Sequence, residues 1–340
     1  MIYRSKAPLR IGLAGGGTDV SPYSDLYGGE ILNATISLFA RVTIEQIPAD
    51  HIIIERLDLD EKEKHQWCEY LPIKGKSDLV AGVYNRIQKD YGIKNGGLRI
   101  STSLDVLPGS GLGTSSTMVV CIIGAFMEML KIPLTNYELA HYAYEIERED
   151  LQLPGGKQDQ YAAMFGGINH MKFSTQGKVS VKPLDIKPEY LSELENNLLL
   201  YFTATTREGG VIINEQVKNV KEQNEKSIEA MHHLKEQVVM LKHALLKGNL
   251  NQLGAILDFG FTNKKLMAHN ITNNTIDEIY AAAKKSGATG GKISGAGGGG
   301  FMILYCPGNV RHKVIKTLKV FGGEVKNYTF IKEGLTTWSV

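Results

Sequence analysis

Four glycine-rich stretches divide this chain, and they constrain its fold more than any other feature. They lie at residues 7–23, 108–120, 154–167 and 294–301. Glycine inside regular structure costs about 0.5–1 kcal/mol relative to alanine, so such clusters mark places where the backbone turns sharply or approaches another group closely. The second stretch, PGSGLGTSSTMVV, runs directly into apolar residues spaced for a helix.

This second stretch has the composition of a phosphate-binding loop. Backbone amides of a glycine turn before a helix converge on one point, and the helix N-terminus adds about half a positive charge. It is not a Walker A loop, because Thr114 stands where that motif has lysine. The hydroxyls that follow are suited to phosphate oxygens or to a magnesium ion. The alternative is a tight turn closed by serine and threonine caps.

The last stretch, SGAGGGGF at 294–301, contains the spacing G-x-G-x-x-G. A dinucleotide fingerprint precedes a helix, whereas this one runs into the strand-like FMILY, which argues against that fold. Two interpretations remain: a backbone cradle beside a ligand, or a flexible hairpin connection.

The other two stretches each offer an aspartate. In the first, Thr18 and Asp19 follow three glycines and are suited to sugar hydroxyls, although Asp19 is also a common turn residue. In PGGKQDQ, Asp159 stands at the start of a short helix. There it is either a functional carboxylate or an acid that complements the helix dipole.

Composition excludes several classes of protein. The 340 residues suggest two domains, and a polar segment near 175–195 places the boundary between 1–185 and 186–340.

A balance of 38 basic against 36 acidic residues gives no sign of a nucleic-acid partner. The longest apolar run contains Glu128 and is too short for a membrane span. Three scattered cysteines argue against disulfides and zinc, so we expect a cytoplasmic location.

The order of elements predicts an α+β fold. Residues 41–47, 51–56 and 97–104 read as strands, 78–91 as a helix and 210–286 as almost wholly helical. Thr135 and Glu138 have capping-box spacing. Heptad-like apolar positions in 211–248 indicate either a coiled coil in a homodimer or helices packed within one chain.

Three motifs in this order resemble the GHMP kinase superfamily: APLRIGLAGGGTD, PGSGLGTSST and KISGAGGGGF. The AGGGTD element is similar to that of the kinases that phosphorylate the anomeric hydroxyl of sugars. The resemblance implies two domains with the active site in the cleft between them, and ATP and Mg²⁺ as cofactors. It also implies a small-molecule sugar phosphate as partner, with no nucleic acid and no membrane.

The resemblance assigns roles to individual residues. Asp159 resembles the catalytic aspartate, either as a base or as a group that orients the hydroxyl. Arg10 stands where relatives carry lysine, and because arginine cannot accept a proton its role is electrostatic. Magnesium is expected at Ser115 and Glu147. The ATP-binding residues are expected to be Pro108, Gly109, Ser110, Gly111, Leu112, Gly113, Thr114 and Ser115. The substrate-binding residues are expected to be Gly17, Thr18, Asp19, Arg207, Gly297 and Gly298.

The acceptor implied by this branch is D-glycero-D-manno-heptose 7-phosphate, phosphorylated at C1 to the 1,7-bisphosphate for nucleotide-activated heptose biosynthesis. Its 7-phosphate requires cations, and the candidates near the motifs are Arg4, Lys6, Lys157, Lys172 and Arg207. Trp67 or a nearby tyrosine is a candidate for the adenine pocket. The alternatives are an L-fucose kinase-like enzyme, a diphosphomevalonate decarboxylase, against which the first motif argues, and a non-catalytic sugar or ATP sensor.

Overall fold

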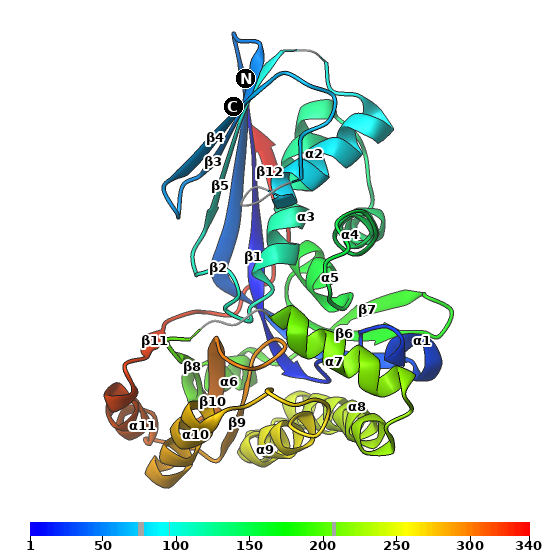
Figure 1. Cartoon of the computed structure of the whole chain (residues 1–340). Helices are drawn as coiled ribbons and strands as arrows, with labels where there is room; N and C mark the ends of the chain where they lie inside the picture. Colours follow the sequence, from blue (N-terminus) through cyan, green and yellow to red (C-terminus); the bar gives the residue numbers. More distant parts are fainter. Residues whose placement is uncertain (74–77, 95, 206–208) are drawn as a thin grey trace.

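Two β-sheets organise the chain (Figure 1). The computed structural model describes residues 1–73, 78–94, 96–205 and 209–340. Within these residues the larger sheet has the strand order β12-β1-β2-β5-β3-β4, with β6 and β7 continuing from β2. Its neighbours pair antiparallel except β3 and β5, which are parallel. The smaller sheet, β11-β8-β10-β9, is wholly antiparallel. The α+β prediction is therefore confirmed.

The strands have these bounds. The larger sheet contains β1 (Ile2–Ala14), β2 (Gly29–Ile47), β3 (His51–Arg56), β4 (Glu61–Gln66), β5 (Gly97–Leu104), β6 (Ile168–Phe173), β7 (Val179–Pro183) and β12 (Thr336–Ser339). The smaller sheet contains β8 (Leu198–Phe202), β9 (Gly290–Ile293), β10 (Phe301–Tyr305) and β11 (Glu324–Lys326).

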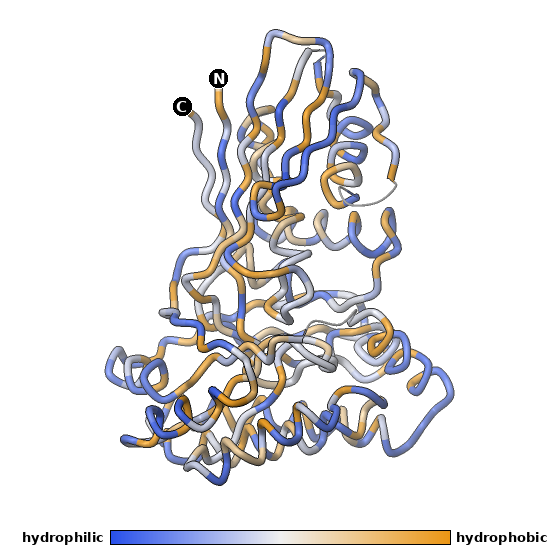
Figure 2. Tube along the Cα trace, turned by 60° about the vertical axis from the view of Figure 1, so that its left-hand side comes forward, coloured by the Kyte–Doolittle hydropathy of each residue, from blue (hydrophilic) through white to orange (hydrophobic). Residues whose placement is uncertain are grey.

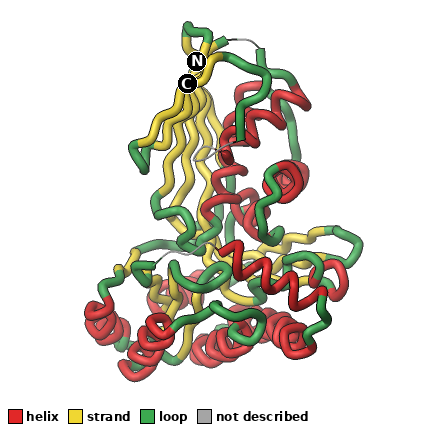
Figure 3. Tube along the Cα trace, viewed as in Figure 1, coloured by secondary structure: helices red, strands yellow, loops and turns green. Residues whose placement is uncertain are grey.

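Helices cover one face of the larger sheet and surround the smaller one (Figure 3). Those of the first half are α1 (Tyr23–Tyr27), α2 (Asp78–Tyr91), α3 (Thr114–Leu130), α4 (Asn136–Glu145), the π-helix η1 (Ile146–Asp150) and α5 (Gln158–Phe165). Those of the second half are α6 (Pro188–Asn197), α7 (Gly209–Lys221), α8 (Glu225–Lys247), η2 (Leu250–Gln252), α9 (Leu253–Lys264), α10 (Asn274–Ser286), α11 (Arg311–Leu318) and η3 (Lys319–Phe321).

The burial of β1 changes along its length. Its first residues alternate in exposure, as in a strand with one face in solvent, whereas residues 7–14 are all buried. This change occurs because α3 and α5 pack against β1, while α8 and α9 of the second half also contact it. The buried end of β1 therefore lies where the two halves of the molecule meet.

One hydrophobic core joins the two halves. Leu9 and Ile11 of β1 pack in the same buried cluster as Leu200, Leu241 and Ile303 of the second half. The helices of this half alternate between hydrophobic and hydrophilic residues along their length, as expected for helices with one buried face (Figure 2). The boundary between 185 and 186 stays a prediction. Residues 336–339, assigned to the second domain from sequence, pair as β12 with β1.

One expectation about local structure needs correction. The polar segment 175–195, near which the boundary was placed, contains β7 and α6, and α6 begins with Pro188 at its first turn. The helical stretch 211–248 is interrupted at residues 222–224, where the Asn224 side chain caps α8 by accepting from the Ser227 amide. The apolar face of α8 is buried against its own chain, so this segment gives no support to a homodimer. The capping box at Thr135 and Glu138 is present as predicted.

Candidate active site

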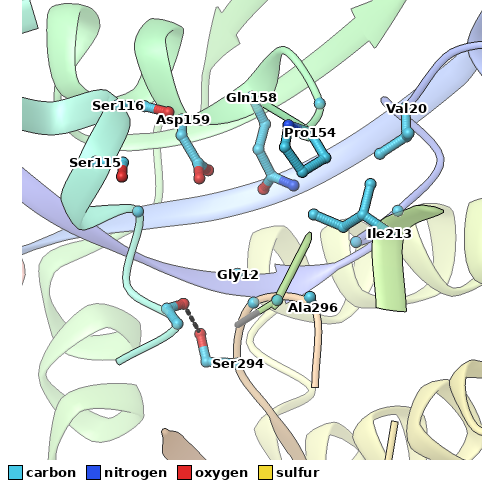
Figure 4. Close-up of a pocket in the computed structure, with 18 of the residues that line it drawn as sticks. Gly12, Val20, Ser115, Ser116, Pro154, Gln158, Asp159, Ile213, Ser294 and Ala296 are labelled. Atoms are coloured by element: carbon cyan, nitrogen blue, oxygen red, sulfur yellow. Dashed lines mark hydrogen bonds between the residues drawn. The ribbon is translucent and has the colours of Figure 1, made fainter. Parts of the chain in front are cut away.

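A cavity of about 510 Å³ lies between the two halves and brings together residues of all four glycine stretches (Figure 4). Ser115 and Asp159 lie at one end of the view, and Val20, Pro154 and Ile213 lie at the other. The glycines leave its walls formed largely of backbone, where amide and carbonyl groups are available to a polar ligand.

The central glycine loop ends at the N-terminus of α3. Gly113 is the N-cap in a left-handed conformation, with a φ of 77°, and no side chain caps this terminus. The alternative of a turn closed by serine or threonine caps is therefore wrong. Gly109, Gly111, Gly113, Thr114 and Ser115 line the cavity, so the first-turn amides of α3 are available to an anion there.

The last glycine stretch supports this loop through direct backbone packing. Phe301 donates its amide to the Ser110 carbonyl, and the Ser294 hydroxyl donates to the Gly111 carbonyl at 2.9 Å. A Cβ atom at Gly111 would lie 2.7 Å from the Ser294 carbonyl oxygen, and one at Gly300 would lie 2.3 Å from that of Ser110. Stretch 294–301 joins the antiparallel strands β9 and β10, so it is a hairpin connection, and these contacts pack it against the loop. Because Ser294, Gly295, Gly297 and Gly299 also line the cavity, a cradle beside a ligand stays a prediction.

Arg10 and Asp159 form a paired charge beside the loop. Arg10 Nε and Nη2 donate to the two carboxylate oxygens of Asp159 at 2.6 and 2.7 Å, and Nη1 donates to the Gly111 carbonyl at 2.7 Å. Such a two-point contact fixes the direction of a carboxylate as well as its position. Asp159 stands in the first turn of α5 with its side chain 21% exposed, so it remains accessible from the cavity.

Asp19 positions the segment that carries Asp159. Its Oδ2 accepts from the backbone amides of Lys157 and Gln158, and its Oδ1 accepts from the Gln158 side chain. Burial raises the pKa of this carboxyl. Asp19 also lines the cavity, as expected of a substrate residue, together with Gly17 and Gly297. Thr18 does not lie at the cavity wall, because its buried hydroxyl donates to the carbonyls of Gly15 and Glu30 within the turn.

Glu147 is a buried carboxylate at the cavity wall. It lies in η1, a π-helical turn of a kind frequent at functional sites, and is only 1% exposed. The Gln160 amide donates to both Glu147 and the Ser116 hydroxyl, and Arg148 lies 3.7 Å from the carboxylate. Burial raises the pKa of Glu147. Sequence reasoning missed Ser116, which is the hydroxyl beside Glu147, whereas Ser115 is exposed.

A magnesium ion fits this wall only together with oxygen atoms from a ligand. Among the described residues, no group of three or more His, Cys, Asp or Glu side chains is arranged to hold a metal. Glu147 offers a buried negative charge with hydroxyl groups nearby, which is a hard-oxygen environment suited to Mg²⁺. Phosphate oxygens and water would have to complete such a site.

Several sequence-predicted residues lie away from the cavity wall. Pro108 is exposed outside it, Leu112 is buried in the core and Gly298 donates its amide to the Ile271 carbonyl. Ser110 is buried, and its hydroxyl has no hydrogen-bond partner among the described residues. Arg207 lies outside the described residues.

The cationic residues chosen from sequence lie elsewhere. Arg4 is exposed on β1, and Lys6 lies over the Phe39 ring. Lys172 pairs with Glu30 at 2.9 Å, and Lys157 lies 3.7 Å from Asp25. None of these four lines the cavity.

Among the residues that the structure describes, the cations that line the cavity in addition to Arg10 are Arg148, Lys264 and Lys292. Lys292 directly precedes the last glycine stretch. Lys264 continues the buried positions 253, 257, 260 and 261 of α9, and this spacing is the signal that was available in the sequence.

Comparison with protein families matches both halves of the chain. Residues 78–167 match the model of the GHMP kinases N terminal domain, and residues 241–319 match that of the GHMP kinases C terminal domain. No helix in the described part of the chain combines the length and apolar character that a membrane crossing requires.

Individual relatives extend over the whole chain. A Campylobacter jejuni protein named D-glycero-alpha-D-manno-heptose 7-phosphate kinase is 44% identical, and the match covers 99% of each chain. A solved structure described as a D-glycero-D-manno-heptose 1-phosphate kinase from Bacteroides thetaiotaomicron superposes with a TM-score of 0.85, at 43% identity over 99% of each chain. An L-fucokinase/L-fucose-1-P guanylyltransferase from Bacteroides fragilis is 25% identical over 88% of this chain and 34% of its own length.

Proposed function

This chain belongs to the GHMP kinase family, and we propose that it transfers the γ-phosphate of ATP to the C1 hydroxyl of D-glycero-D-manno-heptose 7-phosphate. The product would be the 1,7-bisphosphate. A phosphate ester at the anomeric carbon is what a later nucleotidyl transfer requires, so the reaction would serve the synthesis of a nucleotide-activated heptose. Three free cysteines, two of them buried, support a reducing, cytoplasmic location.

The observation that carries this proposal is the arrangement at one end of the cavity. An uncapped helix N-terminus, a buried carboxylate at Glu147 and the Arg10–Asp159 pair border the same space. Phosphoryl transfer needs positioning and charge stabilisation more than covalent chemistry, and these groups supply both. The non-catalytic sensor is disfavoured, because a sensor has no need of a fixed carboxylate beside a phosphate-binding terminus.

In the proposed reaction Asp159 orients the acceptor. Held by Arg10, the Asp159 carboxylate accepts a hydrogen bond from the C1 hydroxyl and so directs the hydroxyl oxygen toward the γ-phosphorus. As the bond from that oxygen to phosphorus forms and the β–γ bridging bond breaks, the hydroxyl proton passes to Asp159. The guanidinium of Arg10 and the first-turn amides of α3 stabilise charge that develops on the transferred group.

ATP and magnesium are assigned to the loop side of the cavity. Gly109, Gly111, Gly113, Thr114 and Ser115 would hold the phosphates, and Ser115 and Glu147 would contribute to holding the ion. Bound magnesium neutralises the phosphate charge and so lowers the cost of attack by an oxygen nucleophile.

A second cavity, of about 240 Å³, offers space for the adenine base. It adjoins the start of the glycine loop and is lined by Leu104, Val106, Leu107, Phe202 and Phe301, with Asp58, Asp105, Glu324 and Lys326 at its margin. Apolar walls with a few polar groups are typical of sites for planar ligands. Trp67, the residue suggested from sequence, instead packs against Tyr84 in the core of the first half.

The test is an ADP-release assay with ATP and Mg²⁺ over a panel of acceptors. The panel contains heptose 7-phosphate, heptose 1-phosphate, unphosphorylated heptose, mannose 6-phosphate and L-fucose, and phosphorus NMR locates the new ester. We expect turnover of heptose 7-phosphate with the ester at C1. The heptose 1-phosphate arm is needed because the names of the two heptose-kinase relatives place the acceptor's phosphate on different carbons.

Other outcomes would replace the proposal. Exclusive use of unphosphorylated sugars would assign the chain to the fucose-kinase side of the family. Binding of sugar and ATP with no turnover of any acceptor would indicate a sensor.

A further inference from the structure

Two buried lysines line the cavity, and the proposed transfer step uses neither. Lys264, from the end of α9, and Lys292, from β9, are 2% and 4% exposed. Lys264 Nζ donates to the Gly295 carbonyl at 2.6 Å, and Lys292 Nζ donates to the Gly12 carbonyl at 2.8 Å.

Within the described part of the chain, neither ammonium group contacts a carboxylate. Among the described residues neither lysine forms an ion pair, and each ammonium with three N–H donors has one protein acceptor. Burial lowers the pKa of Lys264 to about 8, and that of Lys292 well below its ordinary value. An unpaired buried charge is costly, so a pair of them at a cavity wall calls for an anionic ligand.

The two ammonium groups lie near one point beside Gly16. A Cβ atom at Gly16 would lie 3.5 Å from Lys264 Nζ and 3.8 Å from Lys292 Nζ. The missing side chain at Gly16 therefore leaves a space that both cations border. Spare N–H groups from two lysines at such a space suit a phosphate, which has several acceptor oxygens.

The position of this space along β1 separates it from the reacting end. Arg10, which holds Asp159, is followed two residues later by Gly12, to which Lys292 donates, and then by the turn that contains Gly16. Two residues of strand span about 6.6 Å at roughly 3.3 Å per residue. A heptose whose C1 hydroxyl lies at Asp159 extends across a pyranose ring and a two-carbon tail before its C7 phosphate, so its phosphate has to lie at a distance from Asp159, as this space does.

The phosphates of the donor are assigned above to the glycine loop. The Arg10 guanidinium contacts this loop at Gly111, and a Cβ atom at Gly113 would lie 3.4 Å from its central carbon. The amides at the start of α3 and the Glu147 wall also belong to the loop side. The lysine pair adjoins Gly12, Gly16 and the carboxylate Asp19, which contributes to the pKa of Lys264. Its nearest approach to the loop is through Gly295, which accepts from Lys264 and packs against Gly111.

We propose that Lys264 and Lys292 form the subsite for the phosphate group that the acceptor already carries, and that they make the enzyme select a sugar phosphate over a neutral sugar. This inference rests on the proposed function, because it takes the acceptor to be phosphorylated. A neutral sugar at Asp159 would leave both ammonium groups without a counter-charge.

The test compares Lys264→Met and Lys292→Met with Lys265→Met as the matched control. Lys265 is the next residue in the chain, but it pairs with Asp277 at 2.6 Å and does not line the cavity. Binding of heptose 7-phosphate, unphosphorylated heptose and AMP-PNP with Mg²⁺ is measured by calorimetry. The unliganded melting temperature is recorded for each variant, and again with inorganic phosphate.

We expect the affinity for heptose 7-phosphate to fall roughly 30-fold or more in each lysine variant, since a charged hydrogen bond to a dianion is lost. The affinities for unphosphorylated heptose and for AMP-PNP should stay within about threefold, and the control should match the wild type. Lys264→Met should melt above the wild type without ligand, because it removes an unpaired buried charge, and should lose the stabilisation that inorganic phosphate gives.

Three results would overturn the proposal. The first is a loss of AMP-PNP affinity with unchanged sugar-phosphate affinity, which assigns the pair to the donor. The second is an equal loss for phosphorylated and neutral heptose, which assigns it to sugar hydroxyls. The third is no change in binding by folded variants. If instead the wild type does not bind heptose 7-phosphate, the proposed function fails, while stabilisation by inorganic phosphate that disappears in Lys264→Met still supports an anion site.

Discussion

The two ends of the cavity hold positive charges in opposite ways. At the reacting end, Arg10 is committed to Asp159 and to the loop before any ligand binds. At the lysine pair, which we call the far end of the cavity, Lys264 and Lys292 have only backbone carbonyls as partners among the described residues. A charge that is already paired sets geometry, whereas an unpaired one is suited to recognising a ligand. The contrast separates the groups that orient a reaction from those that select its substrate.

Removing the charge of Asp159 would break its ion pair with Arg10 and should have the largest effect on turnover. In Asp159→Asn, a neutral amide faces Arg10 and no longer accepts the hydroxyl proton. We expect kcat to fall by roughly 10²- to 10³-fold, in line with the loss of about 3–4 kcal/mol seen when such groups are removed. ADP release measures kcat, and AMP-PNP affinity should be unchanged. Asp25→Asn, a partly exposed carboxylate outside the cavity, is the control. A normal rate would remove Asp159 from the mechanism.

Glu147 tests whether a buried negative charge at the cavity wall behaves like the buried positive ones. Glu147→Gln keeps the shape but removes the charge, and we expect the Mg²⁺ concentration for half-maximal rate to rise roughly 10–100-fold. Because burial raises the pKa of Glu147, folding disfavours its ionised form, so stability decreases as pH rises through that titration. The variant should therefore melt above the wild type at neutral pH. A lower melting point with unchanged Mg²⁺ dependence would contradict this role.

The pH dependence of acceptor binding sharpens the comparison at the far end. Burial and the charge of Arg10 lower the pKa of Lys264 to about 8, and the charge of Asp19 acts in the opposite direction. Burial, Lys264 and Arg10 lower the pKa of Lys292. Above about pH 8 the ammonium of Lys264 loses its proton, so the KM for the sugar phosphate should rise, approaching tenfold per pH unit. The KM for ATP should not follow this trend. Lys264→Met should remove the dependence, and its persistence in that variant would assign it to another group.

The lowered pKa of Lys264 also affects the pH dependence of stability. A lysine with a lowered pKa in the folded state binds fewer protons there than in the unfolded chain. The free energy of unfolding should therefore increase as the pH rises from about 8 toward the ordinary pKa of lysine. Denaturant unfolding of the wild type and Lys264→Met across this range measures the difference.

Gly16→Ala is the mildest change at the far end. Gly16 has no positive φ, and an added Cβ would meet the two ammonium groups at ordinary contact distances, so the variant should fold with a stability change within about 1 kcal/mol. The added methyl would occupy part of the space between the lysines, and we expect the sugar-phosphate KM to rise roughly threefold to tenfold. Unchanged KM for both substrates would show that no ligand enters this space.

The sequence was sufficient for the elements that depend on local signals. The helix at 78–91, the capping box at Thr135 and the strands at 51–56 and 97–104 occur where they were predicted. Each is specified by its own periodicity or by side-chain contacts a few residues apart. Strand β12 shows the limit, because nothing within 336–339 indicates that it pairs with β1 more than 300 residues earlier.

The site was predictable to the extent that its residues belong to glycine motifs. Asp159, Asp19 and Glu147 line the cavity as expected, and their roles stay predictions. The cations were chosen by closeness in sequence to those motifs, and distance along the chain does not measure distance in the fold. Lys264 comes from a helix whose buried face was interpreted only as packing, and its location depends on how α9 lies against β1 and β9.

The contact between Gly111 and the 294–300 segment has a consequence for chimeras with related kinases. The closest contacts between the two segments join main-chain atoms, so a shift of either segment would displace the other directly. The two segments lie nearly two hundred residues apart in the sequence, but their shapes have to match each other. A recombinant joined anywhere between them should retain turnover only if both glycine segments come from the same parent.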